Sequence, residues 1–171
     1  MLKKLRDQDK QAVRFVLLFF VFVLGFNVLM EISWVQENFV LPYTTMIAQI
    51  SSGLLGLFGN SIQVSGTIIR SDSFAVDIRR GCDGVVATII LISACLAFPL
   101  SWSQRTSGAL LGSLLIQLLN LVRIVGLFLL GAAGATQLFD FFHTYVSQFF
   151  VIALTMVFWI YWIGRQKTYS R

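Results

Sequence analysis

Four apolar runs, each close to the length of a membrane-spanning helix, constrain this chain more than any other feature. They cover about residues 13–33, 85–102, 108–134 and 143–163. A helix needs about 20 apolar residues to cross roughly 30 Å of hydrocarbon. In keeping with this, only 12% of the residues are charged, against roughly 25% in soluble domains. We therefore predict an all-α integral membrane protein, a single domain (residues 1–171) with about four transmembrane helices.

The basic residues indicate how these helices are oriented. They gather in a tail over residues 1–12 and in a second tail over residues 164–171. Because Lys and Arg accumulate on the cytoplasmic side of membrane proteins, both tails are expected in the cytoplasm and the number of spans is expected to be even. This placement also accounts for the net charge of +5 without a nucleic-acid partner.

The segment 34–81, between the first two runs, is then expected at the outer face. Residues 41–59 place their apolar side chains close to one helical stripe, which favours an amphipathic or re-entrant helix over a fifth span. That stripe consists of Tyr43, Met46, Ile47, Ile50, Leu54, Leu57 and Phe58. In residues 61–80, apolar side chains alternate around a Ser-Asp-Ser turn, and this alternation predicts a β-hairpin.

A thiol stands at the outer end of the second run, in the stretch RRGCDGVV. The residues around Cys82 are two arginines, two glycines and an aspartate: Arg79, Arg80, Gly81, Gly84 and Asp83. The arginines and the following helix N-terminus favour a thiolate, and the glycines leave the backbone open to close approach. The aspartate acts in the opposite direction. The two arginines are also candidates for substrate binding.

The third and fourth runs each contribute one further polar residue of interest. Arg123 lies within the third run, where an arginine costs roughly 2.5–3.5 kcal/mol, so it is expected to face the interior of the bundle. Asn120 lies one turn before it on the same face. His143, the single histidine, opens the fourth run on the outer side. Asp140 stands three residues earlier, where it is a candidate to orient the imidazole ring.

These residues together make a set suited to acyl transfer. Cys82 is the expected nucleophile, His143 the acid or base, and Arg123 a donor to a developing oxyanion. With one histidine and no Cys/His cluster, neither a metal site nor a cofactor is expected. The alternative is a non-catalytic membrane assembly or scaffold protein, in which Arg123 and Asn120 clasp neighbouring helices and Cys82 is replaceable.

Three motifs in order, GCDGV, NLVRIV and a lone His opening the last run, resemble the exosortase/archaeosortase family. The short chain looks most like the compact exosortase H, and the similarity covers about Ile78 to Trp162. The resemblance implies a thiol protease and transpeptidase, a hydrolase of the bacterial inner membrane with its active site facing the periplasm. Asp83 departs from the family pattern, in which Ser or Asn usually follows the cysteine.

The resemblance also implies a substrate class. Exosortases act in protein sorting on secreted proteins that end in a PEP-CTERM-like signal: a short motif, a transmembrane helix and a basic tail. For the exosortase H type the motif is of the IPTL kind. Cys82 would cleave near this motif through a thioester, and the acyl group would pass to a cell-envelope acceptor such as a lipid or an amine, or to water.

Overall fold

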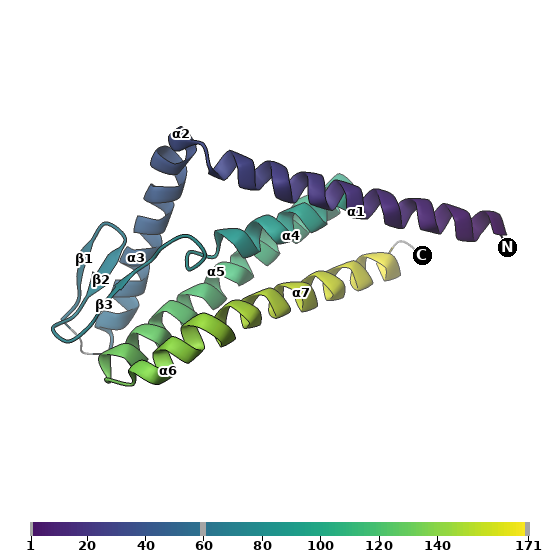
Figure 1. Ribbon diagram of the computed structural model, residues 1–171. Coiled ribbons are helices and arrows are strands. Elements are labelled where there is room, and N and C mark those ends of the chain that lie inside the picture. The colour runs from purple at the N-terminus through teal and green to yellow at the C-terminus, as the bar shows by residue number, and fades with distance from the viewer. Residues whose placement is uncertain (1, 59–60, 170–171) are drawn as a thin grey trace.

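A computed structural model describes the backbone of residues 2–58 and 61–169, and the side chains of residues 9–58, 61–146 and 149–166. Residues 1, 170 and 171 of the two expected basic tails lie outside these ranges. The chain is mostly helical, and its helices run side by side in an elongated bundle with both ends of the chain at the same end of the molecule (Figure 1). The prediction of an all-α membrane protein is confirmed.

Four helices form the bundle: α1 (Leu2–Met30), α4 (Val85–Ala97), α5 (Trp102–Ala132) and α7 (Ser147–Tyr169). The short α4 packs against α1, α5 and α7. The last helix continues without a break from α6 (Thr136–Phe141) through a π-helical stretch, η2 (Phe142–Val146).

Three helical stretches in the described part of the chain are long and apolar enough to cross a bilayer: Asp9–Met30, Trp102–Ala132 and Thr136–Gln166. The fourth expected span, 85–102, is shorter than predicted. Its helix α4 has 13 residues and is about 20 Å long at 1.5 Å per residue. The helix ends because Phe98, which precedes Pro99, is extended, as the proline ring requires of the residue before it.

The turn from α4 to α5 is fixed by polar side chains. Ser101 accepts a hydrogen bond from the backbone N–H of Gln104, whose side chain accepts one from the N–H of Ser101. Arg105 donates to the carbonyls of Leu96 and Leu100, each at 2.9 Å, and so satisfies acceptors at the end of α4. The reciprocal hydrogen bonds of Ser101 and Gln104 form a capping box, and with it α5 begins at Trp102, earlier than the predicted residue 108.

After α1 the chain turns through α2 (Ser33–Val35) and a π-helical stretch, η1 (Gln36–Val40), into α3 (Leu41–Gly56). Helix α3 runs across the end of the bundle that lies away from the chain termini, which is the predicted outer end, at a steep angle to α1 (Figure 1). It packs against α5 and against a small sheet. Its 16 residues make it shorter than the three candidate spans. Its position at the membrane interface stays a prediction.

Most of the predicted apolar stripe of this helix does not face the protein, although Ile47 does. The buried residues of α3 are Thr44, Ile47, Ala48, Ser51 and Leu55. Most of the stripe points outward, with Met46, Ile50, Leu54, Leu57 and Phe58 exposed. The small side chains allow α3 to approach its neighbours closely, and the large apolar ones are left on a surface suited to lipid.

The segment 61–80 forms a three-stranded antiparallel sheet of β1 (Gln63–Ser65), β2 (Ile68–Arg70) and β3 (Ala75–Asp77), in that order. Ile69 of the central strand pairs with Val64 on one side and with Val76 on the other. The predicted hairpin is confirmed as β2–β3. Its first arm is broken into two strands at Gly66, where φ is +60°, so one more tight turn is present than the alternation indicated.

Two clusters of buried residues hold these parts together. The outer core joins α3, the sheet and α5, and consists of Ile47, Ala48, Leu55, Ile69, Ile78, Ile124 and Phe128. The bundle core joins α4, α5 and α7, and consists of Ala87, Leu91, Cys95, Ile116 and Val151. The loop of residues 79–84 links the sheet of the first cluster to the α4 helix of the second.

Candidate active site

The length of α5 indicates how deep in the membrane the candidate site lies. Trp102, an exposed aromatic residue at the start of α5, belongs at a membrane interface. Arg123 lies 21 residues further along, which is about 31 Å at 1.5 Å per residue and about the thickness of the hydrocarbon layer. If Trp102 lies at the inner interface, Arg123 is therefore level with the outer boundary of the membrane.

The loop that carries Cys82 is tied to the sheet on one side. The N–H of Ile78 donates to the carbonyl of Thr67 at 3.0 Å, and the hydroxyl of Thr67 donates to Asp77 at 2.7 Å. The loop then turns tightly, with the N–H of Cys82 donating to the carbonyl of Arg79 at 2.8 Å. Gly81 has a φ of +92°, a value that favours glycine.

On its other side the loop lies against α5 at Gly84. This residue has a φ of +78°, and a Cβ atom placed there would lie 2.9 Å from the amide of Gln117 and 3.3 Å from Nδ2 of Asn120. Gln117 also donates to the hydroxyl of Thr88 at 3.1 Å. The positive φ favours glycine at this position, and a Cβ atom there would displace the amide of Gln117. The contact fixes the start of α4 against the face of α5 that bears Arg123.

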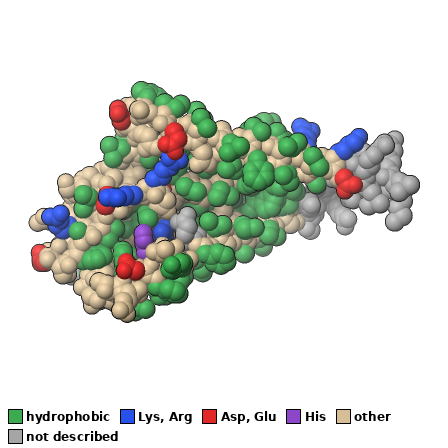
Figure 2. Space-filling view, in the orientation of Figure 1, with side chains coloured by type: hydrophobic (Ala, Val, Ile, Leu, Met, Phe, Trp, Pro, Cys, Tyr) green, Lys and Arg blue, Asp and Glu red, His purple; other side chains and the backbone are tan. Residues whose placement is uncertain are grey.

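Cys82 and His143 are in direct contact. The Sγ atom of Cys82 lies 3.2 Å from Nε2 of His143, within the limit for a hydrogen bond that involves sulfur. His143 belongs to η2, and its ring stacks on Phe139 with 5.5 Å between ring centres and planes 5° apart. A π-helical stretch inside a longer helix is frequently found at a functional site. In Figure 2 the single histidine is visible at the surface with a basic side chain beside it.

Arg123 approaches the same thiol from α5. Its Nη2 atom lies 3.7 Å from Sγ of Cys82, and its Nη1 atom donates to the carbonyl of Gly81 at 3.4 Å. No carboxylate among the described residues forms a salt bridge with this guanidinium. Its positive charge therefore remains available to a negative charge that develops next to the sulfur.

Asp83 points away from solvent and into the protein. It is fully buried, and its Oδ1 atom accepts a hydrogen bond from the N–H of Val85 at 3.0 Å, which caps the start of α4. Burial raises the pKa of this carboxyl, and hydrogen bonds from backbone N–H groups oppose that rise. Burial, with the nearby Asp83 as a second cause, raises the pKa of Tyr43 in α3 to about 12.

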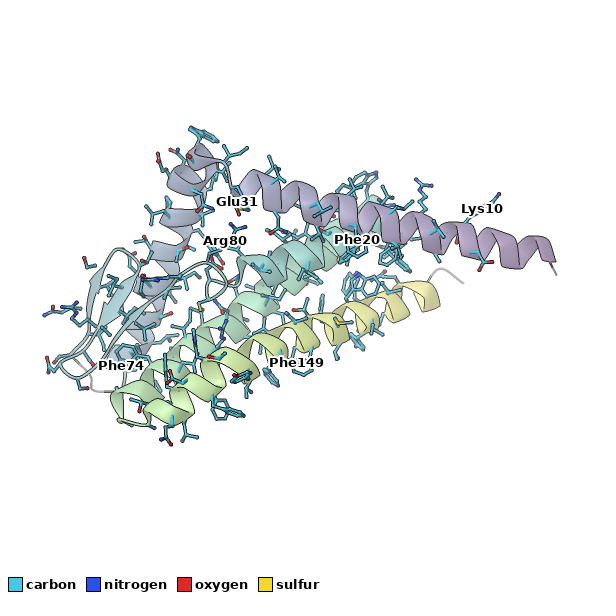
Figure 3. The ribbon with its side chains drawn as sticks, in the orientation of Figure 1. Lys10, Phe20, Glu31, Phe74, Arg80 and Phe149 are labelled. Atoms are coloured by element: carbon cyan, nitrogen blue, oxygen red, sulfur yellow. The ribbon has the colours of Figure 1, made fainter. Side chains whose placement is uncertain are left out.

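The two arginines before Cys82 are occupied elsewhere. Arg79 is exposed and donates to Asp77 at 2.8 Å; this hydrogen bond and that from Thr67 lower the pKa of the Asp77 carboxyl. Arg80 forms an ion pair with Glu31 at the end of α1, and Figure 3 shows the two side chains turned toward one another. Each arginine thus has an acidic partner of its own, and its effect on the thiol stays a prediction. Their role in substrate binding stays a prediction.

Asp140 and Asn120 differ in their placement. Asp140 is exposed, and its role in orienting His143 stays a prediction. The ring stacks on Phe139, a contact that the sequence analysis missed. Asn120 is fully buried beneath the Gly84 contact. Neither polar atom of its amide has a hydrogen-bond partner among the described residues.

The sheet contributes to the site through Phe74. This residue packs edge-on against Phe139, with ring centres 5.3 Å apart, and against Phe128 of α5 at 5.6 Å. A Cβ atom on Gly131 would lie 2.1 Å from the Phe74 ring, so glycine is required there. Figure 3 shows Phe74 between the sheet and the outer end of the bundle. Phe74, Phe139 and His143 thus form a continuous aromatic cluster.

The arrangement is that of a multi-pass membrane protein with a thiol, an imidazole and an unneutralised guanidinium gathered at one end of its bundle. A family model described as transmembrane exosortase (Exosortase_EpsH) matches residues 10–159. This match covers most of the chain, and the chain belongs to the transmembrane exosortase family. No significant match was found among curated proteins or among solved structures.

Proposed function

We propose that this protein is a cysteine transpeptidase that cleaves a C-terminal sorting signal from secreted proteins at the outer face of the bacterial inner membrane. Membership of the exosortase family supports the reaction class. The observation that carries the proposal is the contact of Cys82 Sγ with both His143 Nε2, at 3.2 Å, and Arg123 Nη2, at 3.7 Å.

In the first half of the reaction, His143 takes the proton of the Cys82 thiol and the sulfur attacks the carbonyl carbon of the scissile peptide bond. The carbonyl oxygen gains negative charge, and Arg123 donates hydrogen bonds to it. The C–N bond then breaks, a thioester forms on Cys82, and His143 returns the proton to the leaving amine. Arg123 cannot accept a proton, so its contribution is electrostatic.

In the second half, an acceptor attacks the thioester and regenerates the thiol. An amine or hydroxyl of the cell envelope gives transfer, and water gives hydrolysis. His143 is placed to take a proton from the acceptor and to return one to the sulfur. The buried carboxyl of Asp83 points into the protein, toward the start of α4. That placement supports a capping role for Asp83 and leaves the proton transfers to His143.

The test is to co-express the chain with a tagged protein that ends in a PEP-CTERM-like signal with an IPTL-type motif, a helix and a basic tail. Processing is followed by gel shift and by intact mass of the product. Wild type is expected to process the substrate, Cys82→Ser is expected to lose all processing, and Cys95→Ser serves as the matched control because Cys95 lies in the bundle core. Unchanged processing by Cys82→Ser would favour the non-catalytic scaffold instead.

A further inference from the structure

A lateral groove of about 510 Å³ runs past the candidate site, between α5 and the continuous helix of η2 and α7. Arg123 is the single charged residue in its lining, and the remainder is apolar. The α5 side presents Leu119, Val122, Gly126, Leu127 and Leu130, and the opposite side presents Phe142, Val146, Phe150 and Val151. Figure 3 shows the neighbouring Phe149 on the outer side of α7.

The lining residues recur at helical spacing on both walls. On α5 each lining residue has others three or four residues away, and Phe142, Val146 and Phe150 are four residues apart. The groove is thus the seam between two packed helices, a surface into which the side chains of a third helix fit. Gly126 lies on the α5 wall, and no atom is found within 4 Å of the position its Cβ would take. A small residue at such a point lets another helix approach closely within a membrane.

Arg123 lies part of the way along this groove and not at its end. Leu130 is about 10 Å beyond Arg123 toward the outer end of α5, and Leu119 is about 6 Å from it in the other direction, at 1.5 Å per residue. A single lipid bound in the groove would place its head group at the outer end of the groove and its acyl chains toward the membrane interior. A polypeptide that crosses the level of Arg123 fills the groove on both sides of the guanidinium. The shape therefore favours a polypeptide.

We propose that this groove holds the substrate chain as it leaves the membrane. The outer turns of the substrate's transmembrane helix lie against Leu119 and Phe150, and the residues before the scissile bond lie between Gly126 and Phe142. This inference rests on the proposed function. It places the carbonyl that is attacked beside Arg123, so that cleavage falls at the outer end of the apolar segment.

Crosslinking tests the location directly. Gly126→Cys in a Cys82→Ala background is combined with single cysteines placed along the outer turns of the substrate helix, and disulfide formation is induced in isolated membranes. The matched control is Ser113→Cys, which lines a different groove of about 650 Å³ that does not include Arg123. Crosslinks are expected from Gly126→Cys and not from Ser113→Cys. Crosslinks from Ser113→Cys alone, or from neither, would overturn the proposal.

A variant that fills the groove tests whether substrate processing depends on it. Gly126→Trp should lower processing by about tenfold or more, because the indole fills the seam, while Cys82 still reacts with a small thiol reagent. Gly25→Trp on α1 is the control, since Gly25 also has open space at its Cβ position. If Gly126→Trp processes substrate as wild type does while Cys82→Ser does not, the groove proposal fails and the transpeptidase proposal stands. If Cys82→Ser also processes normally, the proposed function itself fails.

Discussion

The Sγ atom of Cys82 lies 3.2 Å from Nε2 of His143, although 61 residues separate them along the chain. The thiol comes from a loop that the sheet and the Gly84 contact hold against α5. The imidazole comes from a π-helical stretch and is held by a stack of aromatic rings. The two groups meet only when the outer core and the bundle are both folded, which makes their contact sensitive to changes in either part.

Removal of the imidazole tests the role of His143. His143→Ala should lower the rate of processing by about 10²–10⁴-fold, the usual contribution of a general acid or base. The protein should still fold, because His143 is only partly buried and belongs to neither cluster of buried residues. Initial rates of processing in membranes, at matched protein levels, measure the effect. A rate within twofold of wild type would remove His143 from the mechanism.

Arg123 is expected to act through its charge and its geometry together. Arg123→Ala should lower the rate by about 10²–10³-fold, as loss of an oxyanion donor does. Arg123→Lys keeps the charge but not the paired donors that reach Gly81 and Cys82, so it should recover only part of the activity. The amount of substrate bound to a Cys82→Ala background, measured by co-purification, separates binding from chemistry. Full activity of Arg123→Lys would show that charge alone is sufficient.

Gly84 should tolerate a side chain poorly. Gly84→Ala combines a positive φ, which costs about 1–2 kcal/mol for a residue with a Cβ, with a clash against Gln117. Gly66→Ala is the matched control, since Gly66 also has a positive φ but no atom within 4 Å of its Cβ position. Thermal unfolding in detergent and processing should both be impaired more by Gly84→Ala. Equal effects of the two changes would show that the contact with α5 is unimportant.

Asp83 makes stability depend on pH in a defined direction. Burial raises its folded-state pKa above the unfolded value, so the stability it contributes is complete at acidic pH and is lost as the pH rises through the folded value. Asp83→Asn keeps an acceptor for the N–H of Val85 and carries no charge. It should therefore stabilise the protein at neutral pH, by about 1–3 kcal/mol, and less at acidic pH. A larger loss of stability at neutral than at acidic pH would contradict this reading of the buried carboxyl.

Much of the site's placement follows from patterns along the chain. The positive charges at both ends predict the topology, and that predicted topology places Cys82 and His143 on the same side of the membrane. An arginine within an apolar run must face the protein interior, which brings Arg123 toward them. The short strand β1 is also marked in the sequence by Gly66, and the early end of α4 by Pro99.

Other features depend on contacts between distant segments. The buried face of α3 includes small residues such as Ala48 and Ser51, and the apolar stripe read from the sequence does not identify this face. Arg80 is drawn to Glu31, 49 residues away. The stacking of His143 on Phe139 has no signature in the sequence beyond their spacing of four residues.

The central claim is that Cys82 forms a covalent bond with substrate, and intact-mass analysis of the protein after brief exposure to substrate tests it most directly. The account predicts a mass increase equal to the acyl part of the substrate, lost on treatment with hydroxylamine and mapped by digestion to the peptide that contains Cys82. An adduct on another residue, or processing that proceeds at full rate with no adduct and in the Cys82→Ser variant, would contradict it.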